Sequence, residues 1–154
     1  MDQFTLSSNC PLSWALNVIM NTEQAFEKSL IALEQKGFEN IREPERVLAT
    51  IWSIEAEVNN GGFNQFFYNS AGDISFYSAQ ALTAIGAHKM AAIAQKALDI
   101  FGKAGPPKNR DKRVAQLSEL EEENEEYLNK LDYEFTEYPD NVQELLATYV
   151  ESNF

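Results

Sequence analysis

Apolar residues recur at helical spacing along nearly the whole of this 154-residue chain. The pattern predicts a short buried helix over 12–20, a second helix from Asn21 or Thr22 to Gly37, and a third that begins at Pro44. The inward face of the third helix is expected to carry Val47, Leu48, Ile51, Trp52 and Val58. Further helices are expected over 75–86, 87–101 and 111–131 and from Pro139 onward. The helix over 87–101 is expected to face inward with Met90, Ile93, Ala94, Ala97, Leu98 and Phe101. Glycine, asparagine and proline residues predict turns at 59–62 and 102–107.

One stretch, 131–138, fits two kinds of secondary structure. Leu131, Tyr133 and Phe135 alternate with polar residues as in a strand, whereas Leu131, Phe135 and Tyr138 also lie at helical spacing. No second strand is available to pair with it, so helix or turn is the better interpretation. The sequence therefore predicts an all-α fold: a single compact domain over 1–154 with six to eight short helices and no sheet.

Composition indicates a folded protein without a membrane span. Hydrophobic residues make up 44% of the chain, with ten Phe, six Tyr and two Trp. No apolar run approaches the ~20 residues that a membrane helix needs. The N-terminal region lacks the basic and apolar parts of a secretory signal, and Cys10 is the one cysteine. We therefore expect a cytoplasmic location and no internal disulfide.

Negative charge is concentrated near the C-terminal end. The net charge is −12. Residues 1–118 hold 12 acids and 11 bases, whereas 119–154 hold 12 acids and only Lys130. Such asymmetry favours a basic partner and disfavours direct binding of nucleic acid, whose phosphates attract a basic surface.

The acidic segment contains a regular run of glutamates. Glu119, Glu122, Glu123 and Glu126 would form one ridge on a helix, at a spacing of the same order as a phosphate ladder. Polar residues interrupt the apolar seam here, which predicts that this part of the helix lifts away from the core. The alternative is a solvated helix face that serves solubility alone.

Three other features are candidate sites. The Glu57–Phe63 loop could hold a phosphate through backbone N–H groups, but no Lys or Arg lies between Arg46 and Lys89, so a structural turn is favoured. Glu55 and Glu57 do not share a helix face, which disfavours an acid–base pair; we expect one to be exposed and the other to bond the loop. His88 is the only histidine and is expected at a helix start or on the surface. We therefore predict no catalytic residues, no metal site and no cofactor.

A dense aromatic cluster follows the loop. It could line a ligand pocket, but aromatic residues at this density more often form core. The members are Phe63, Phe66, Phe67, Tyr68, Phe76 and Tyr77.

The loop and the cluster together carry a family resemblance. The string NNGGFNQFFYN resembles the NGGFxQFFxN signature of the bacterial DNA mimic protein family, and the resemblance extends over about 40–150. The matching signature residues are Asn59, Asn60, Gly61, Gly62, Phe63, Gln65, Phe66, Phe67 and Asn69. Weaker matches follow at Gly72, 81–82, 85–87, 131–132 and Phe135.

The resemblance implies an all-helical acidic protein that imitates DNA, binds a transcription factor and forms a homodimer. The signature block is expected to be structural, and the Glu119–Glu126 ridge is expected to bind the partner. We therefore hypothesise a regulator that covers the DNA-binding surface of a basic protein such as a transcription factor. An immunity-type inhibitor of a basic toxin and a small-molecule enzyme using the 57–65 loop region are the alternatives. A deep polar pocket at the loop would favour the enzyme, and a convex acidic ridge would favour a binding protein.

Overall fold

A computed structural model describes residues 11–154, with the side chains of 11–14 and of residue 20 left out. The chain forms six α-helices within this range. They are α1 (Pro11–Lys36), α2 (Glu43–Tyr68), α3 (Ser78–Ala84), α4 (His88–Asp99), α5 (Arg110–Thr136) and α6 (Val142–Asn153). Two 3-10 helices, η1 (Phe38–Asn40) and η2 (Ser70–Tyr77), flank α2. Residues 11–154 contain no β-strand, so the all-α prediction is confirmed.

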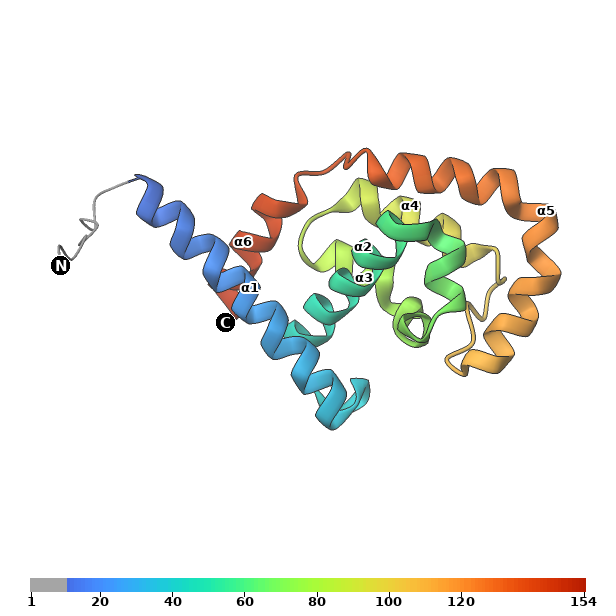
Figure 1. The fold of residues 1–154 in the computed structure, drawn as a ribbon, viewed down its shortest axis with the longest axis horizontal. Helices are drawn as coiled ribbons and strands as arrows, with labels where there is room; N and C mark the ends of the chain where they lie inside the picture. Colours follow the sequence, from blue (N-terminus) through green and yellow to red (C-terminus); the bar gives the residue numbers. More distant parts are fainter. Residues whose placement is uncertain (1–10) are drawn as a thin grey trace.

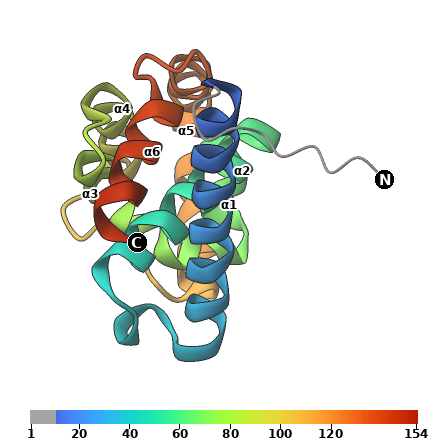
Figure 2. The same cartoon turned by 90° about the vertical axis from the view of Figure 1, so that its left-hand side faces the viewer.

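The central element is α2, which packs on α1, α3, α5 and η2. In Figure 1, α5 extends around one side of the core formed by α2, α3 and α4, while α1 lies at the opposite end of the molecule. Figure 2 shows α1 and α6 side by side, in agreement with their contacts. None of the helices in residues 11–154 is long and apolar enough to cross a membrane.

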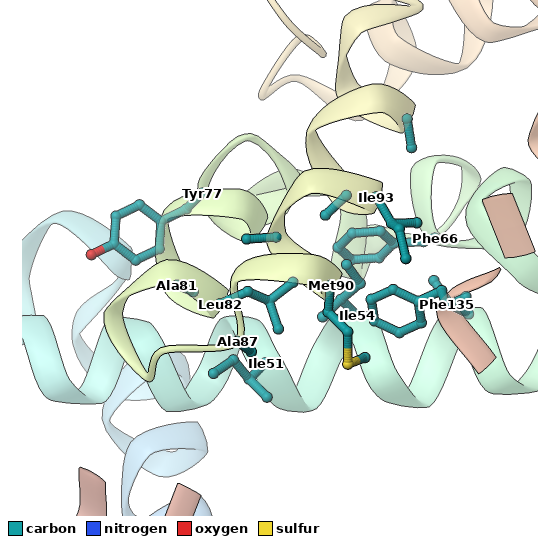
Figure 3. Close-up of a cluster of buried hydrophobic side chains, with 14 of the residues drawn as sticks. Ile51, Ile54, Phe66, Tyr77, Ala81, Leu82, Ala87, Met90, Ile93 and Phe135 are labelled. Atoms are coloured by element: carbon teal, nitrogen blue, oxygen red, sulfur yellow. The ribbon is translucent and has the colours of Figure 1, made fainter. Parts of the chain in front are cut away.

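The core forms where α2 meets α3, α4 and the end of α5. Figure 3 shows side chains from these elements meeting there, among them Ile54, Phe66, Met90 and Phe135. All six residues predicted to face inward on the fifth expected helix are buried. These are Met90, Ile93, Ala94, Ala97, Leu98 and Phe101. The aromatic cluster divides: Phe63, Phe66, Phe67 and Tyr77 are buried, Phe76 is half-buried and Tyr68 is exposed.

The predicted break near Asn21 and Thr22 is wrong. One continuous helix, α1, replaces the two expected helices, and the Thr22 hydroxyl donates to the Val18 carbonyl at 2.9 Å instead of capping a new helix. The expectation that 12–20 is buried is also wrong where side chains are described. Leu16 and Ile19 are exposed because the neighbouring helices cover only part of α1.

The lengths and ends of several helices differ from the prediction. Three helices, α1, α2 and α5, have 26, 26 and 27 residues and are not short. Residues 59–62 do not form a separating turn, because α2 continues through them with a kink at Gly62. The predicted loop at 102–107 is confirmed, and 131–136 is helical as preferred. The last helix begins at Val142 and not at Pro139.

The prediction that Trp52 faces inward is wrong, because 49% of its surface is exposed. Ile51 and Ile54 take the inward positions of this turn and are completely buried. The error arises because Trp52 lies at the edge of the apolar stripe, where burial depends on what packs beside it.

Candidate protein-binding surface

The family-like NNGGF segment forms the kink in α2. Gly62 has φ 82° and ψ −178°, a backbone region that is essentially restricted to glycine. The kink leaves the N–H of Phe63 free of the helix, and this group donates to Asp132 Oδ1 of α5 at 2.7 Å. A Cβ atom at position 62 would overlap the same carboxylate. Glycine is therefore required both for the backbone angle and for the close approach of α5.

Polar side chains on the two sides of the kink bond to one another. The Glu57 carboxylate accepts from Gln65 Nε2 at 2.8 Å and from Asn69 Nδ2 at 2.9 Å. Asn60 Nδ2 donates more weakly to Gln65 Oε1 at 3.4 Å. These bonds join the turn before the kink to the turn after it.

Tyr138, which follows the C-terminal end of α5, forms a second set of hydrogen bonds to α2. The Tyr138 hydroxyl donates to Glu55 Oε1 at 3.0 Å and accepts from Asn59 Nδ2 at 2.7 Å. Burial raises the pKa of Glu55, and the hydrogen bond from Tyr138 opposes part of this rise. Both Glu55 and Glu57 are half-buried, so the expectation that one of them is exposed is wrong.

The beginning of α5 is held by a buried arginine. Arg113 has no exposed surface. Its guanidinium donates to the carbonyls of Phe67 at 2.6 Å and Asn69 at 2.9 Å, and to the Asp73 carboxylate at 2.9 Å. Gly72 allows this approach, because a Cβ there would crowd both the guanidinium and the Phe66 carbonyl. The segment that follows the kink therefore fixes the first turn of α5.

Sequence reasoning missed the structural roles of Arg113, which is buried, and of Asp132, which is half-buried. In the sequence, Arg113 belongs to a basic cluster and Asp132 is one of several weak matches to the family pattern. Each lies on the apolar seam of α5, four residues from Leu117 or Leu128 respectively. A charged residue on an apolar seam is a usable signal, since a buried charge requires a partner.

The middle of α5 carries the predicted acidic ridge, defined as Glu119, Glu122, Glu123 and Glu126. All four side chains are exposed. Between Leu117 and Leu128 no residue of α5 is buried, and only Leu120 and Asn124 are half-buried. Figure 1 shows α5 bending in this region so that it follows the outside of the core. The Asn124 amide donates to the Leu120 carbonyl at 2.8 Å, a type of side-chain bond that accompanies helix bending.

The ridge has no basic neighbours along the helix. No Lys or Arg occurs between Arg113 and Lys130, and Lys130 lies 3.8 Å from Glu134 instead. Among the described residues, none of the four ridge carboxylates forms an ion pair. The adjacent Glu121 accepts from Asn64 Nδ2 at 2.6 Å, which links the ridge segment to α2. The result is a fixed, uncompensated negative surface.

The loop region at 57–65, the alternative site for an enzyme, does not line any of the three clefts described for residues 11–154. Within the same residues, no group of three or more His, Cys, Asp or Glu side chains could hold a metal ion. His88 is exposed at the first position of α4, as expected. Cys10 lies outside the described residues.

Comparison with known proteins gives one match. A family model described as DMP19-like protein matches residues 39–153. No curated protein and no solved structure was found to match the chain.

Proposed function

We propose that this chain, which belongs to the DMP19-like protein family, acts as a DNA mimic. In this proposal the acidic ridge occupies the DNA-binding surface of a basic protein such as a transcription factor. The family is one of DNA mimics. The observation that carries the proposal for this chain is the exposed, unneutralised run of glutamates in the middle of α5.

The charge density of this segment is close to that of DNA. Six glutamates lie within the eight residues 119–126. At a helical rise of ~1.5 Å per residue, eight residues span ~12 Å, or about one charge per 2 Å. Duplex DNA carries one charge per ~1.7 Å of its axis. Four of these six glutamates, the acidic ridge, lie on one face of the helix, so a partner would meet about one charge per ~3 Å, close to the ~3.4 Å spacing of phosphates along one DNA strand.

The contacts that hold α5 on the rest of the fold favour binding of a partner without a large rearrangement of the helix. Arg113 fixes one end of the helix and Asp132 the other, while Asn64 contacts Glu121 near the middle. A ridge held in place loses less conformational entropy on binding than a flexible acidic tail would. The signature block thus supports the ridge without being part of the binding surface.

The experiment is a pull-down from the source cell with this protein as bait and DNA as competitor. A ridge variant with Glu119, Glu122, Glu123 and Glu126 all changed to Gln should lose the partner, and DNA carrying the partner's site should displace the wild type. Binding should also weaken with salt, which screens exposed charges beyond ~8 Å at physiological strength.

The matched control changes four other exposed glutamates to Gln, so that the net charge falls equally. Glu27, Glu34, Glu39 and Glu43 lie on α1, η1 and the first turn of α2 and are all exposed. This control variant should keep the partner. Equal loss in both variants would mean that net charge, and not the ridge, drives binding. A captured toxin that is insensitive to DNA would instead support the immunity-type alternative.

A further inference from the structure

A large cleft lies on a part of the molecule that the ridge does not reach. It has a volume of about 1100 Å³ and is lined by α1, α2, the connection 138–141 and the first half of α6. No residue of the ridge or of the NNGGF segment contributes to its walls. Figure 2 shows the side of the molecule on which α1 and α6 run together.

The walls of the cleft expose large apolar side chains. Trp52 of α2 is 49% exposed and Ile19 of α1 is 44% exposed, and Leu146 of α6 lies deeper in the wall. The Phe26 ring packs against Trp52 with 5.5 Å between the ring centroids, so that the indole has a firm support. Large apolar groups that gather on one surface are typical of protein-interaction sites.

The same walls are acidic. Glu23, Glu55, Asp140 and Glu144 line the cleft, and no Lys or Arg of the described part of the chain does. Glu23 and Glu144 are exposed. Glu55 is half-buried and has only the Tyr138 hydroxyl as a hydrogen-bond donor among the described residues. A cationic group in the cleft would therefore find unneutralised carboxylates beside an apolar wall.

We propose that this cleft binds a basic amphipathic helix of a protein partner. The apolar face of that helix packs on Ile19, Trp52 and Leu146, and its flanking Lys or Arg side chains reach Glu23, Glu55 and Glu144. Helix-in-groove binding of this kind uses an apolar groove with anchor side chains at helical spacing. Charge complementarity selects a basic helix over a neutral or acidic one.

Two other occupants fit less well. Small-molecule sites typically measure ~300–1,000 Å³ and enclose their ligand, whereas this cleft is larger and open to solvent. A second copy of the chain using the same face would place Glu23 and Glu144 opposite like charges, because a two-fold contact pairs a surface with itself. The homodimer expected from the family resemblance would then use another surface.

The inference is independent of the DNA-mimic proposal and is tested with a synthetic probe. The probe is a labelled peptide of about 18 residues, five helical turns, with Leu on one face and Lys on the other. A second peptide keeps the Leu face and carries Glu in place of Lys. Binding is measured by fluorescence anisotropy. The wild type should bind the basic peptide and not the acidic one.

Two cleft variants and the ridge variant locate the binding site. The double variant Ile19→Ala, Trp52→Ala should bind the basic peptide about tenfold more weakly or worse, since a buried aromatic anchor contributes strongly to affinity at an interface. The double variant Glu23→Gln, Glu144→Gln removes charge and leaves the apolar wall unchanged. Its affinity for the basic peptide should be several-fold lower than that of the wild type. The four-Gln ridge variant loses more charge but should stay within about twofold of the wild type, with thermal melting confirming that each variant is folded.

Several results would overturn the inference. One is a wild type that binds neither peptide, or binds both equally. Another is a ridge variant that loses the basic peptide while the cleft variants keep it, which would show simple polycation binding. A third is a dimer in light scattering that the Ile19→Ala, Trp52→Ala variant splits into monomers, in which case a second copy occupies the cleft.

Discussion

The NNGGF segment and the acidic ridge stand out equally in the sequence, but the fold uses them in opposite ways. Several polar groups around the kink are paired within the protein: the Phe63 N–H with Asp132, and Glu57 with Gln65 and Asn69. The ridge carboxylates have no such partners among the described residues. Both segments are distinctive in the sequence. What distinguishes the structural motif from the interaction surface is whether its polar side chains have hydrogen-bond partners within the protein.

This comparison predicts the largest effect for the aromatic core behind the kink. Phe66 is completely buried, and Phe66→Ala should lower the free energy of unfolding by ~3–5 kcal/mol, through lost burial and the cavity left behind. For a chain of this size that corresponds to a melting temperature about 6–20 °C lower. Thermal unfolding followed by circular dichroism measures it.

Tyr68→Ala, two residues away, is the control. Its ring is exposed and lies 5.1 Å from the Arg110 guanidinium, so its loss should cost less than ~1 kcal/mol. Equal effects of the two substitutions would mean that the segment is not organised around a buried face.

The next effect concerns Gly62. Gly62→Ala should cost ~2–4 kcal/mol, because it adds backbone strain and displaces the Asp132 carboxylate from the Phe63 N–H. Gly102 has the same φ of 82°, but a Cβ atom there would meet only open space, so Gly102→Ala should show only the strain, ~1–2 kcal/mol. Urea unfolding of both variants measures the two costs. Equal costs would show that the approach of α5 at Gly62 is unimportant for stability.

A smaller effect is expected from the pH dependence of Asp132. Burial raises the pKa of this carboxyl, and the Phe63 N–H opposes part of the rise. The native state then binds a proton more tightly than the unfolded state, so the contribution of Asp132 to stability falls as the pH rises through the carboxyl range. Asp132→Asn keeps an oxygen for Phe63 but cannot titrate.

The measurement is the free energy of unfolding of the wild type minus that of Asp132→Asn, taken from about pH 3 to about pH 7, a range that spans ordinary carboxyl pKa values. This difference should fall as the pH rises. The shift is expected to be smaller than the Gly62 effect, since Asp132 is only half-buried and solvent screens part of its interactions. A rising difference would show that the hydrogen bond outweighs burial.

The helical class and most of the core could be predicted from the sequence because periodicity reports directly on which face of a helix is apolar. The inward residues of α4 and the exposure of the ridge follow from that pattern alone. The kink at Gly62 inside a continuous helix could not be predicted in the same way. Two glycines indicate a turn locally, but here α5 supplies Asp132 to the freed N–H, and the helix continues after a kink.

The two candidate surfaces also differ in whether the sequence could predict them. The ridge is local in sequence, so charge and spacing are enough to find it. The cleft combines Ile19, Trp52 and Leu146 from three helices, and no single stretch of sequence contains it. The pattern even predicts Trp52 to be inside, since periodicity places a residue on a face but does not show what covers the edge of that face.

The smallest stability effect is expected at the ridge itself. Changing Glu119, Glu122, Glu123 and Glu126 to Gln should leave the free energy of unfolding unchanged or raise it by less than ~1 kcal/mol, because like charges three and four residues apart repel on a helix. The gain should shrink in 1 M salt, where the screening length falls to ~3 Å. The matched variant at Glu27, Glu34, Glu39 and Glu43 should instead lose a little stability, since Glu39 pairs with Lys108 and Glu43 lies in the favourable first turn of α2. Urea unfolding at low and high salt measures all three proteins. A ridge variant that loses more than ~1 kcal/mol would show that these glutamates stabilise the fold, and the contrast with the NNGGF segment would disappear.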